Sequence, residues 1–266
     1  MLAGPPENDI PIPDAVMRYA EKRPIEVVWL NDLGGLTFRI GDGVKDTFIK
    51  WAPTNSGLDL EMEQIKLEWA ITFTPVPKVL EFGRDDLGSW LVTEGIEAEN
   101  AVSERWKKDP ALAVTALGLG LREMHDVLPV DECPFSWSAQ DRISRVRGRI
   151  VRGETHPTHW HEEFRGLSTE AILEEMDSPP PSNELVVCHG DACAPNTLID
   201  QGGRWAGNVD MASLGIADRW ADLAIASWST QWNYGSGWEI LFYDSYGIDP
   251  NIQKIRFYRL LWDLDA

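Results

Sequence analysis

The polar residues between positions 186 and 210 are the ones best placed to do chemistry. The segment VVCHGDACAPNTLID reads as a strand ending at His189, then a loop that carries Asp191 and, five residues later, Asn196. Another short strand ends at Asp210, fourteen residues after Asn196. Any one of these side chains alone more often stabilises a turn. As an ordered set, two acids and an amide at strand ends can orient a hydroxyl and bind Mg²⁺, as phosphoryl transfer requires.

The chain before these residues is expected to be β-rich. Residues 25–51 are predicted to form two strands around a tight turn, with the segment KDTFIKWAP following. Residues 75–95 read as two more strands joined by a turn. Between them, a helix is predicted over 54–70, with a Ser56-x-x-Asp59 capping pattern at its start. Its predicted buried face consists of Leu58, Met62, Ile65 and Trp69.

The chain after Gly95 is expected to be mainly helical. Asp109 and Pro110 are predicted to cap and start a helix. A hairpin is predicted over 197–210, and helices from Ala217 onward. The helix that starts at Pro110 has a predicted apolar stripe, which consists of Leu112, Ala116, Leu117, Leu121, Met124 and Leu128. The predicted fold class is therefore α+β, with a small β-rich lobe over residues 1–94 and a larger helical lobe over 95–266.

The composition of the chain argues against nucleic-acid and membrane partners. The chain has 266 residues and a formal net charge of −19, which argues against a nucleic-acid partner bound through a general basic surface. The same charge suits a cationic partner, although it also serves solubility. No apolar run is long enough to span a membrane and no secretory signal is evident, so a membrane partner is not expected. Three cysteines favour a reducing cytoplasm.

Several segments together resemble a known family, the aminoglycoside phosphotransferases, and most closely the 3′-phosphotransferases of the kanamycin and neomycin kinase type. The HGD-x₄-N motif alone would indicate only a kinase-like phosphotransferase, choline and homoserine kinases included. The resemblance implies a two-lobed, protein-kinase-like fold and covers nearly the whole chain. The segments that carry it are HGDACAPNTLID, NVDMASLGIADRWADLA, LGGLTFRIGDG, FIKWAP, SGLDLEMEQIKLEWA, TPVPKVLEFG and FYRLLWDLDA.

The resemblance also implies roles for individual residues. Asp191 would be the catalytic base, and Asn196 and Asp210 would be Mg²⁺ ligands with ATP as co-substrate. Lys50 would hold the α- and β-phosphates and pair with Glu63 on the following helix. The order of strand lysine, helix glutamate and catalytic loop is what a kinase lobe requires.

Two glycine-containing segments complete the implied nucleotide site. Gly34 and Gly35 lie in a loop that would cover the phosphates with backbone amides, although hairpin turns use the same pair. Thr93 to Gly95 would be the hinge that offers backbone groups to adenine. A plain linker between the lobes is equally consistent with this last segment.

The implied acceptor is a small cationic aminoglycoside. Glu162 and Glu163 match one acidic region of the family, and Asp263 near the C-terminus matches the other, with the terminal carboxylate of Ala266 adjoining it. Carboxylates form strong, charge-assisted hydrogen bonds with ammonium groups. Solvated surface charge is an equally good interpretation of Glu162 and Glu163.

The chain departs from the family after the second metal ligand. Family members usually continue D-x-G-R, whereas this chain has Asp210-Met211-Ala212-Ser213. If the backbone at position 212 needs a positive φ angle, alanine is strained there by about 1 kcal/mol. The missing arginine also removes a positive charge near the catalytic loop.

Other potentially reactive side chains are interpreted as structural. His156, His159 and His161 are close in sequence but have no accompanying ligand pattern, so a solvated loop is favoured over a metal site. Cys188 and Cys193 are interpreted as packing residues.

The function predicted from the sequence is transfer of the γ-phosphate of ATP to a hydroxyl of an aminoglycoside, most consistently the 3′-hydroxyl, which would confer antibiotic resistance. A monomer or weak dimer is expected. The alternatives are a kinase of another small hydroxylated metabolite or of another aminoglycoside hydroxyl such as streptomycin 3″. A catalytically weak nucleotide-binding homologue and an acidic scaffold for cationic partners are further alternatives.

Overall fold

The computed structural model describes residues 4, 10–41, 43, 46–155 and 160–265. The chain forms two compact units, Met1–Glu97 and Ala98–Ala266. In the part of the chain that is described, no helix is both long and apolar enough to cross a membrane.

The first unit is built on a five-stranded antiparallel sheet with the strand order β1-β2-β3-β5-β4. Residues 25–53 form three strands, whereas two were predicted over 25–51. The third strand is present because Leu36–Ile40 pairs on one side with Ile25–Leu30 and on the other with residues from Thr47 onward. The strands are β1 (Ile25–Leu30), β2 (Leu36–Ile40), β3 (Thr47–Pro53), β4 (Val79–Arg84) and β5 (Gly88–Glu94).

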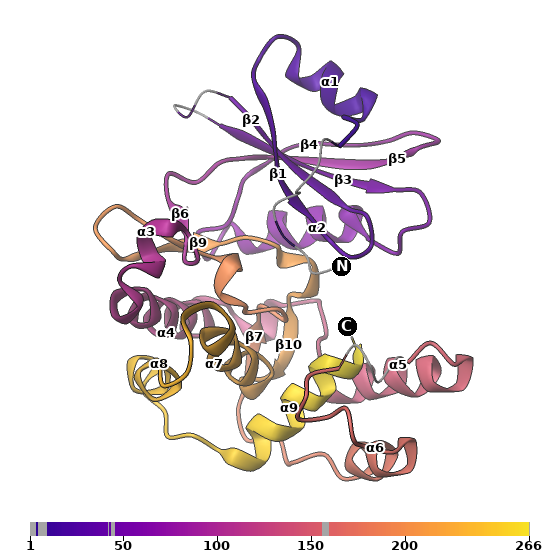
Figure 1. Ribbon diagram of the computed structural model, residues 1–266, viewed down its shortest axis with the longest axis vertical. Helices are drawn as coiled ribbons and strands as arrows, with labels where there is room; N and C mark the ends of the chain where they lie inside the picture. The colour runs from indigo at the N-terminus through magenta and orange to yellow at the C-terminus, as the bar shows by residue number, and fades with distance from the viewer. Residues whose placement is uncertain (1–3, 5–9, 42, 44–45, 156–159, 266) are drawn as a thin grey trace. The chain divides into compact units, whose positions relative to one another are not determined.

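Two helices cover opposite faces of this sheet (Figure 1). Helix α1 (Asp14–Ala20) contributes Val16 and Ala20 to a buried cluster that includes Ile49 of β3. The next residue of the strand, Lys50, points to the other face, because successive side chains of a strand alternate. On that face it forms an ion pair with Glu63 of α2 (Leu60–Ala70).

The predicted buried face of α2 is wrong. Met62 and Ile65 are 38% and 43% exposed. The buried residues are Leu60, Glu63, Lys66, Leu67 and Ala70. Leu60, Glu63, Leu67 and Ala70 are spaced 3, 4 and 3 residues apart and lie on one face, but the charged Glu63 interrupts the apolar pattern. The N-cap is Asp59, whose carboxylate accepts from the Met62 amide; Ser56 instead accepts from Leu58.

The second unit surrounds one buried helix, α7 (Trp220–Tyr234), whose residues from Trp220 to Thr230 are all buried. Three helices pack against it: α4 (Pro110–Val127), α8 (Glu239–Tyr246) and α9 (Ile252–Asp265). Helix α4 starts as predicted, with Pro110 in its first turn and the Asp109 carboxylate accepting from Leu112. Its predicted stripe from Ala116 to Leu128 is buried.

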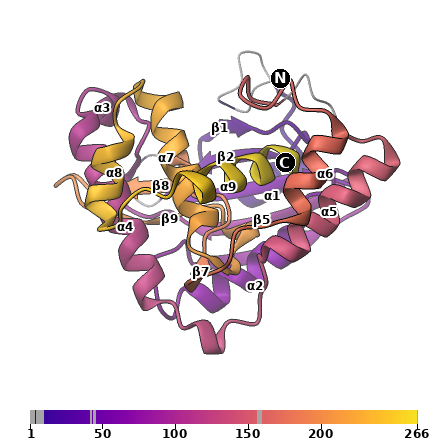
Figure 2. The same ribbon diagram turned by 90° about the horizontal axis from the view of Figure 1, so that it is seen from below.

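The remaining helices of this unit lie at its edge. Helices α5 (Ala139–Arg152) and α6 (Thr169–Asp177) contact each other and lie side by side in Figure 2. Short segments complete the unit: β6 (Glu99–Asn100), α3 (Glu104–Lys107) and η1 (Val130–Glu132).

Short strands frame the loops that carry the predicted catalytic residues. β7 (Leu185–Cys188) pairs with β10 (Gly215–Asp218), and the predicted hairpin is present as β8 (Thr197–Ile199) and β9 (Trp205–Asn208). Helix therefore begins at Trp220 and not at Ala217 as predicted, because Ala217 pairs with Val186. Single turns η3 (Ala194–Asn196) and η4 (Met211–Ser213) connect the strands.

Candidate active site

The backbone of the Asp191 loop is held by a carboxylate from the buried helix α7. Asp222 is fully buried, and its two oxygens accept hydrogen bonds from the backbone amides of His189 (2.6 Å) and Gly190 (2.8 Å). Gly190 has φ = +86°, and a Cβ atom there would lie 2.2 Å from the Ser213 carbonyl oxygen. Only glycine fits this turn, which places Asp191 immediately after the end of β7.

Asp222 is itself part of a buried network. His125 of α4 bonds to Asp222 Oδ2 through Nε2 (3.0 Å) and to the Tyr246 hydroxyl through Nδ1 (2.9 Å). Burial alone would raise the pKa of Asp222, but the hydrogen bond and charge of His125 outweigh it and lower the pKa. Asp222 therefore stays ionised and keeps both amides bonded.

The Asp191 carboxylate is bonded within its own loop. Cys193 Sγ donates to Oδ1 (3.1 Å), and Asn196 Nδ2 donates to Oδ2 (3.2 Å) and to the Asp191 carbonyl (2.9 Å). Burial raises the pKa of Asp191; the bonds from Cys193 and Trp262 oppose this shift, and the Asp210 charge adds to it. A carboxylate with a raised pKa is a stronger base for a hydroxyl proton. Cys193 therefore does more than pack.

Asn196 and Asp210 offer oxygen atoms beside Asp191. Because Asn196 directs its amide nitrogen at Asp191, its amide oxygen is the atom that remains for a cation. Asp210 lies close enough for its charge to raise the pKa of Asp191. It also adopts a left-handed conformation (φ 64°, ψ 59°), which is strained for a residue other than glycine and is typical of functional sites. An amide and a carboxylate oxygen suit Mg²⁺, a hard cation that prefers oxygen ligands.

A cavity of about 210 Å³ opens on the Asp191 loop. Its lining comes from the loop before α5, from α5, from the catalytic loop, from η4 and from α9. The lining residues are Trp137, Arg142, Gly190, Asp191, Ser213, Trp262 and Asp265.

In the first unit, the structure brings Lys50 and Glu63 together. Lys50 Nζ lies 2.5 Å from Glu63 Oε1, and the Glu63 side chain is only 4% exposed. The Gly34–Gly35 turn is closed by Asn31, whose side-chain oxygen accepts from the amides of Leu33 and Gly35. The amides of Leu33 and Gly35 therefore donate their hydrogen bonds within the hairpin turn.

The predicted adenine hinge lies at the end of β5. Thr93 pairs with Phe48 of β3, and the Gly95 amide donates to the Asp46 carbonyl (2.9 Å). A Cβ atom on Gly95 would lie 2.8 Å from that carbonyl, so glycine allows the close approach of the two backbones.

The predicted substrate acids do not share one environment. Glu162 and Glu163 are exposed in a turn, and Glu163 lies 3.6 Å from Arg256. Asp263 is buried, and both of its oxygens bond to His161, one to the backbone amide (2.7 Å) and one to Nδ1 (2.6 Å). His156, His159 and Ala266 lie outside the described residues.

An aromatic cluster adjoins Asp263. The His161 ring stacks on Trp232 at 5.0 Å and an interplanar angle of 15°, and it lies 4.0 Å from the Trp228 ring. Trp262 lies 5.6 Å from Trp232 and lines the same cavity as Asp191, so the cluster extends to the catalytic loop.

Comparison with known proteins agrees with this geometry. A model of the phosphotransferase enzyme family (APH) matches residues 31–261. The chain belongs to this family. The family resemblance and the α+β, kinase-like fold expected from the sequence are thereby confirmed.

Relatives of this phosphotransferase include aminoglycoside 3′-phosphotransferases from Streptomyces fradiae and Streptomyces ribosidificus. They are 36% and 34% identical, over 79% and 87% of this chain and 81% and 91% of their own. The crystal structure of an aminoglycoside-3′-phosphotransferase of type VIII matches with a TM-score of 0.80 and 31% identity, covering 94% of this chain and 98% of its own. An aminoglycoside phosphotransferase from Streptomyces rimosus, in complex with ADP and streptomycin, matches with a TM-score of 0.72 and 27% identity, covering 89% and 94%.

The departure of this phosphotransferase from D-x-G-R causes no backbone strain at position 212. Among the described residues other than glycine, positive φ angles occur at Glu21, Asn55 and Asp210. Ala212 lies in the η4 turn, so alanine fits there. The arginine of the family pattern is replaced by Ser213, and the guanidinium that lines the Asp191 cavity is supplied by Arg142 of α5.

Sequence reasoning missed several residues of this phosphotransferase that surround Asp191. Trp137 and Arg142 precede the loop by about fifty residues in sequence, and Trp262 follows it by about seventy. Asp222 had one signal: it is an acid in the otherwise apolar segment WADLAIASWS. A charge inside a buried helix requires a partner.

Proposed function

We propose that this protein transfers the γ-phosphate of ATP to the 3′-hydroxyl of an aminoglycoside. The observation that carries the proposal is the Asp191 carboxylate, which burial makes more basic and which lies in a loop pinned by Asp222, next to a cavity. The activities of the relatives, and the ADP and streptomycin in one matching structure, support the same reaction class.

Asp191 accepts the proton of the acceptor hydroxyl as that oxygen attacks the γ-phosphorus and ADP leaves. Asn196 keeps the carboxylate oriented and, with Asp210, would hold Mg²⁺. Mg²⁺, when bound, neutralises charge on the phosphate oxygens. Lys50, held by Glu63, neutralises the α- and β-phosphates.

The two lobes divide this work. Residues 1–94 form the nucleotide-binding lobe, in which Thr93 to Gly95 offer backbone groups to adenine. Gly34 and Gly35 cover the phosphates after their amides exchange the bonds that they donate to Asn31 in the turn. Residues 95–266 form the catalytic and substrate lobe. In this proposal Glu162, Glu163 and Asp263 attract the ammonium groups of the acceptor, Asp263 after exchanging its bonds with His161. A monomer or weak dimer without nucleic-acid or membrane partners remains our prediction.

The test is ADP release from Mg-ATP with kanamycin, neomycin, lividomycin, streptomycin and choline as acceptors. Turnover with kanamycin and neomycin but not with lividomycin, which lacks the 3′-hydroxyl, would identify the acceptor group. Turnover with streptomycin alone would favour the second candidate, a streptomycin 3″-kinase, for which a 28% identical relative from Streptomyces griseus gives support.

The role of Asp191 is tested by Asp191→Ala. We expect turnover to fall by about 10³-fold or more, because the general base is lost, while ATP affinity stays within about twofold. Wild-type turnover in this variant would contradict the assignment.

A further inference from the structure

Two side chains that line the Asp191 cavity each carry a buried N–H group with no hydrogen-bond acceptor among the described residues. These groups are the indole Nε1 of Trp137 and the guanidinium Nη1 of Arg142. The Arg142 side chain is 1% exposed, so solvent does not reach it in bulk. Buried polar groups are almost always paired, and a buried cationic donor is the costliest to leave unpaired. Two such donors that line one cavity point to a ligand rather than to a packing defect.

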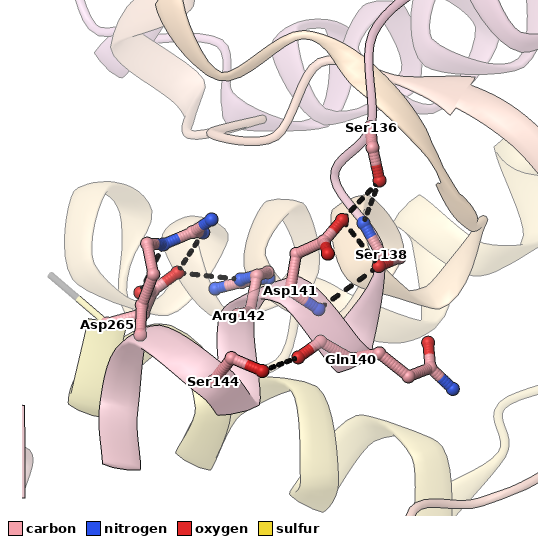
Figure 3. Close-up of polar contacts among 8 residues, drawn as sticks. Ser136, Ser138, Gln140, Asp141, Arg142, Ser144 and Asp265 are labelled. Carbon is pink, nitrogen blue, oxygen red and sulfur yellow. Dashed lines mark hydrogen bonds and ion pairs between the residues drawn. The ribbon is translucent and has the colours of Figure 1, made fainter. Parts of the chain in front are cut away.

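Arg142 is held rigidly in this position (Figure 3). Its Nε donates to Asp265 Oδ2 (3.0 Å), and the guanidinium lies 4.9 Å from the centre of the Trp137 ring. Asp265 also binds Arg145 (2.6 Å), so its charge is already balanced by two guanidinium groups. Arg142 therefore cannot turn Nη1 to another partner without losing its bond to Asp265.

Trp137 is held equally firmly. Its backbone amide donates to the Ile216 carbonyl of β10 (3.0 Å), which ties the loop before α5 to the strand that pairs with β7. Asp141, which accepts from the hydroxyls of Ser136 and Ser138, closes the first turn of α5 around the same loop. Both donors are thus preorganised before any ligand binds, which reduces the entropy cost of binding.

The chemistry of the two donors defines what they bind. Both can only donate, and one is cationic, so they select an oxygen acceptor and repel an ammonium group. Asp191, in the same cavity, is the acceptor for the reacting hydroxyl. We propose that Trp137 Nε1 and Arg142 Nη1 bind an oxygen on a carbon next to the phosphorylated hydroxyl and so determine substrate specificity. This inference rests on the proposed function. It adds that, although the substrate is cationic, the carbon next to its phosphorylated hydroxyl must carry an oxygen and not an ammonium group.

The test compares Trp137→Phe and Arg142→Lys with the unaltered protein. Phenylalanine keeps an aromatic ring at the position that both guanidinium groups face, and it removes the N–H together with part of the indole ring system. The control variant Trp106→Phe shares this loss of ring volume. We expect kcat/KM for kanamycin A to fall about 5-fold in Trp137→Phe and about 10- to 100-fold in Arg142→Lys, because a charged donor contributes more. KM for ATP should not change in Trp137→Phe, and the melting temperature should not fall further than in Trp106→Phe, whose tryptophan is more deeply buried.

A matched control is Trp106→Phe. Trp106 of α3 also has a buried Nε1 with no acceptor among the described residues and also lies beneath a guanidinium, that of Arg105, but it does not line the cavity. This variant should keep kcat/KM. An equal loss in Trp106→Phe, or no loss in either cavity variant, would overturn the inference.

Kanamycin B identifies the oxygen, because it differs from kanamycin A only in an amine in place of the hydroxyl at C2′. A loss confined to kanamycin A in Trp137→Phe would place the bonded oxygen at C2′. An equal loss with both drugs would place it at C4′, where both carry a hydroxyl. If the unaltered protein phosphorylates neither drug nor any other aminoglycoside, both the proposed function and this inference fail. Normal turnover that is insensitive to both substitutions overturns this inference alone.

Discussion

Each unit contains one buried carboxylate that holds a functional group in place, and the two carboxylates do so differently. In the first unit, Glu63 holds the amine of Lys50 through an ion pair in which Lys50 is 24% exposed. In the second, Asp222 holds the catalytic loop through two backbone amides and His125, and all of these side chains are excluded from solvent. A side chain that must meet a ligand is held by a contact that stays partly accessible, whereas a backbone that must not move is held by buried hydrogen bonds.

The largest effect should follow from removing the Asp222 network. Asp222→Ala leaves the amides of His189 and Gly190 and the ring of His125 without their acceptor. We expect the free energy of unfolding in urea to fall by about 3 to 5 kcal/mol, together with loss of turnover. Asp222→Asn, which keeps one oxygen acceptor, should lose less. A change below about 1 kcal/mol in Asp222→Ala would show that the loop is held by other contacts.

Breaking the pair in the first unit should instead affect nucleotide use. Glu63→Gln removes the charge that holds Lys50, and we expect kcat/KM for ATP to fall about 10- to 100-fold. Because Glu63 is buried, the free energy of unfolding should also fall, by about 1 to 3 kcal/mol, which is less than in Asp222→Ala. The matched control is Glu61→Gln on the same helix, where Glu61 and Arg84 form an exposed pair. Equal losses in the two variants would mean that Lys50 does not depend on Glu63.

The smallest effect concerns acid stability. The pKa of Asp222 is lower in the folded than in the unfolded protein, so the unfolded state binds more protons as the pH falls. The stability that Asp222 contributes is complete above about pH 4 and is lost as the pH falls through its folded pKa. In Asp222→Asn, the difference in unfolding free energy between about pH 6 and pH 3 should be smaller than in the unaltered protein by about 1 kcal/mol. Exposed Asp244→Asn should leave this difference unchanged.

The catalytic loop and helix α2 differ in how well the sequence alone predicts them. Asp191, Asn196 and Asp210 were identifiable because their spacing along the chain and the strands between them are local features. The buried face of α2 was predicted wrongly because Glu63 lies on it, and hydrophobic periodicity counts a charged residue as exposed. The ion pair with Lys50 of β3 lets Glu63 lie on the inner face beside the buried Leu67 and Ala70.

The contacts around Asp191 are still harder to predict from the sequence than the buried face of α2. Cys193 follows Asp191 by two residues, yet its thiol bond to the carboxylate depends on the loop conformation that Asp222 and Gly190 impose. Asp263 was selected because it matches an acidic region of the family, but His161 binds both of its oxygens, whereas Trp262 beside it lines the Asp191 cavity. Side chains that are neighbours in sequence on α9 thus have different partners, because adjacent positions on a helix point about 100° apart.

The sequence by itself therefore indicated a β-rich first part before a mainly helical one, the loop that carries Asp191 and, through the family resemblance, the reaction class, since each depends on residue types at short spacings. The tertiary structure alone decided which donors line the cavity beside Asp191 and which acids are already bonded within the protein. Trp137 and Arg142 lie about 120 residues before Trp262 in the chain, and packing against β10, Asp265 and the His161 cluster brings them together. Long-range contacts of this kind leave no periodic trace in a single sequence.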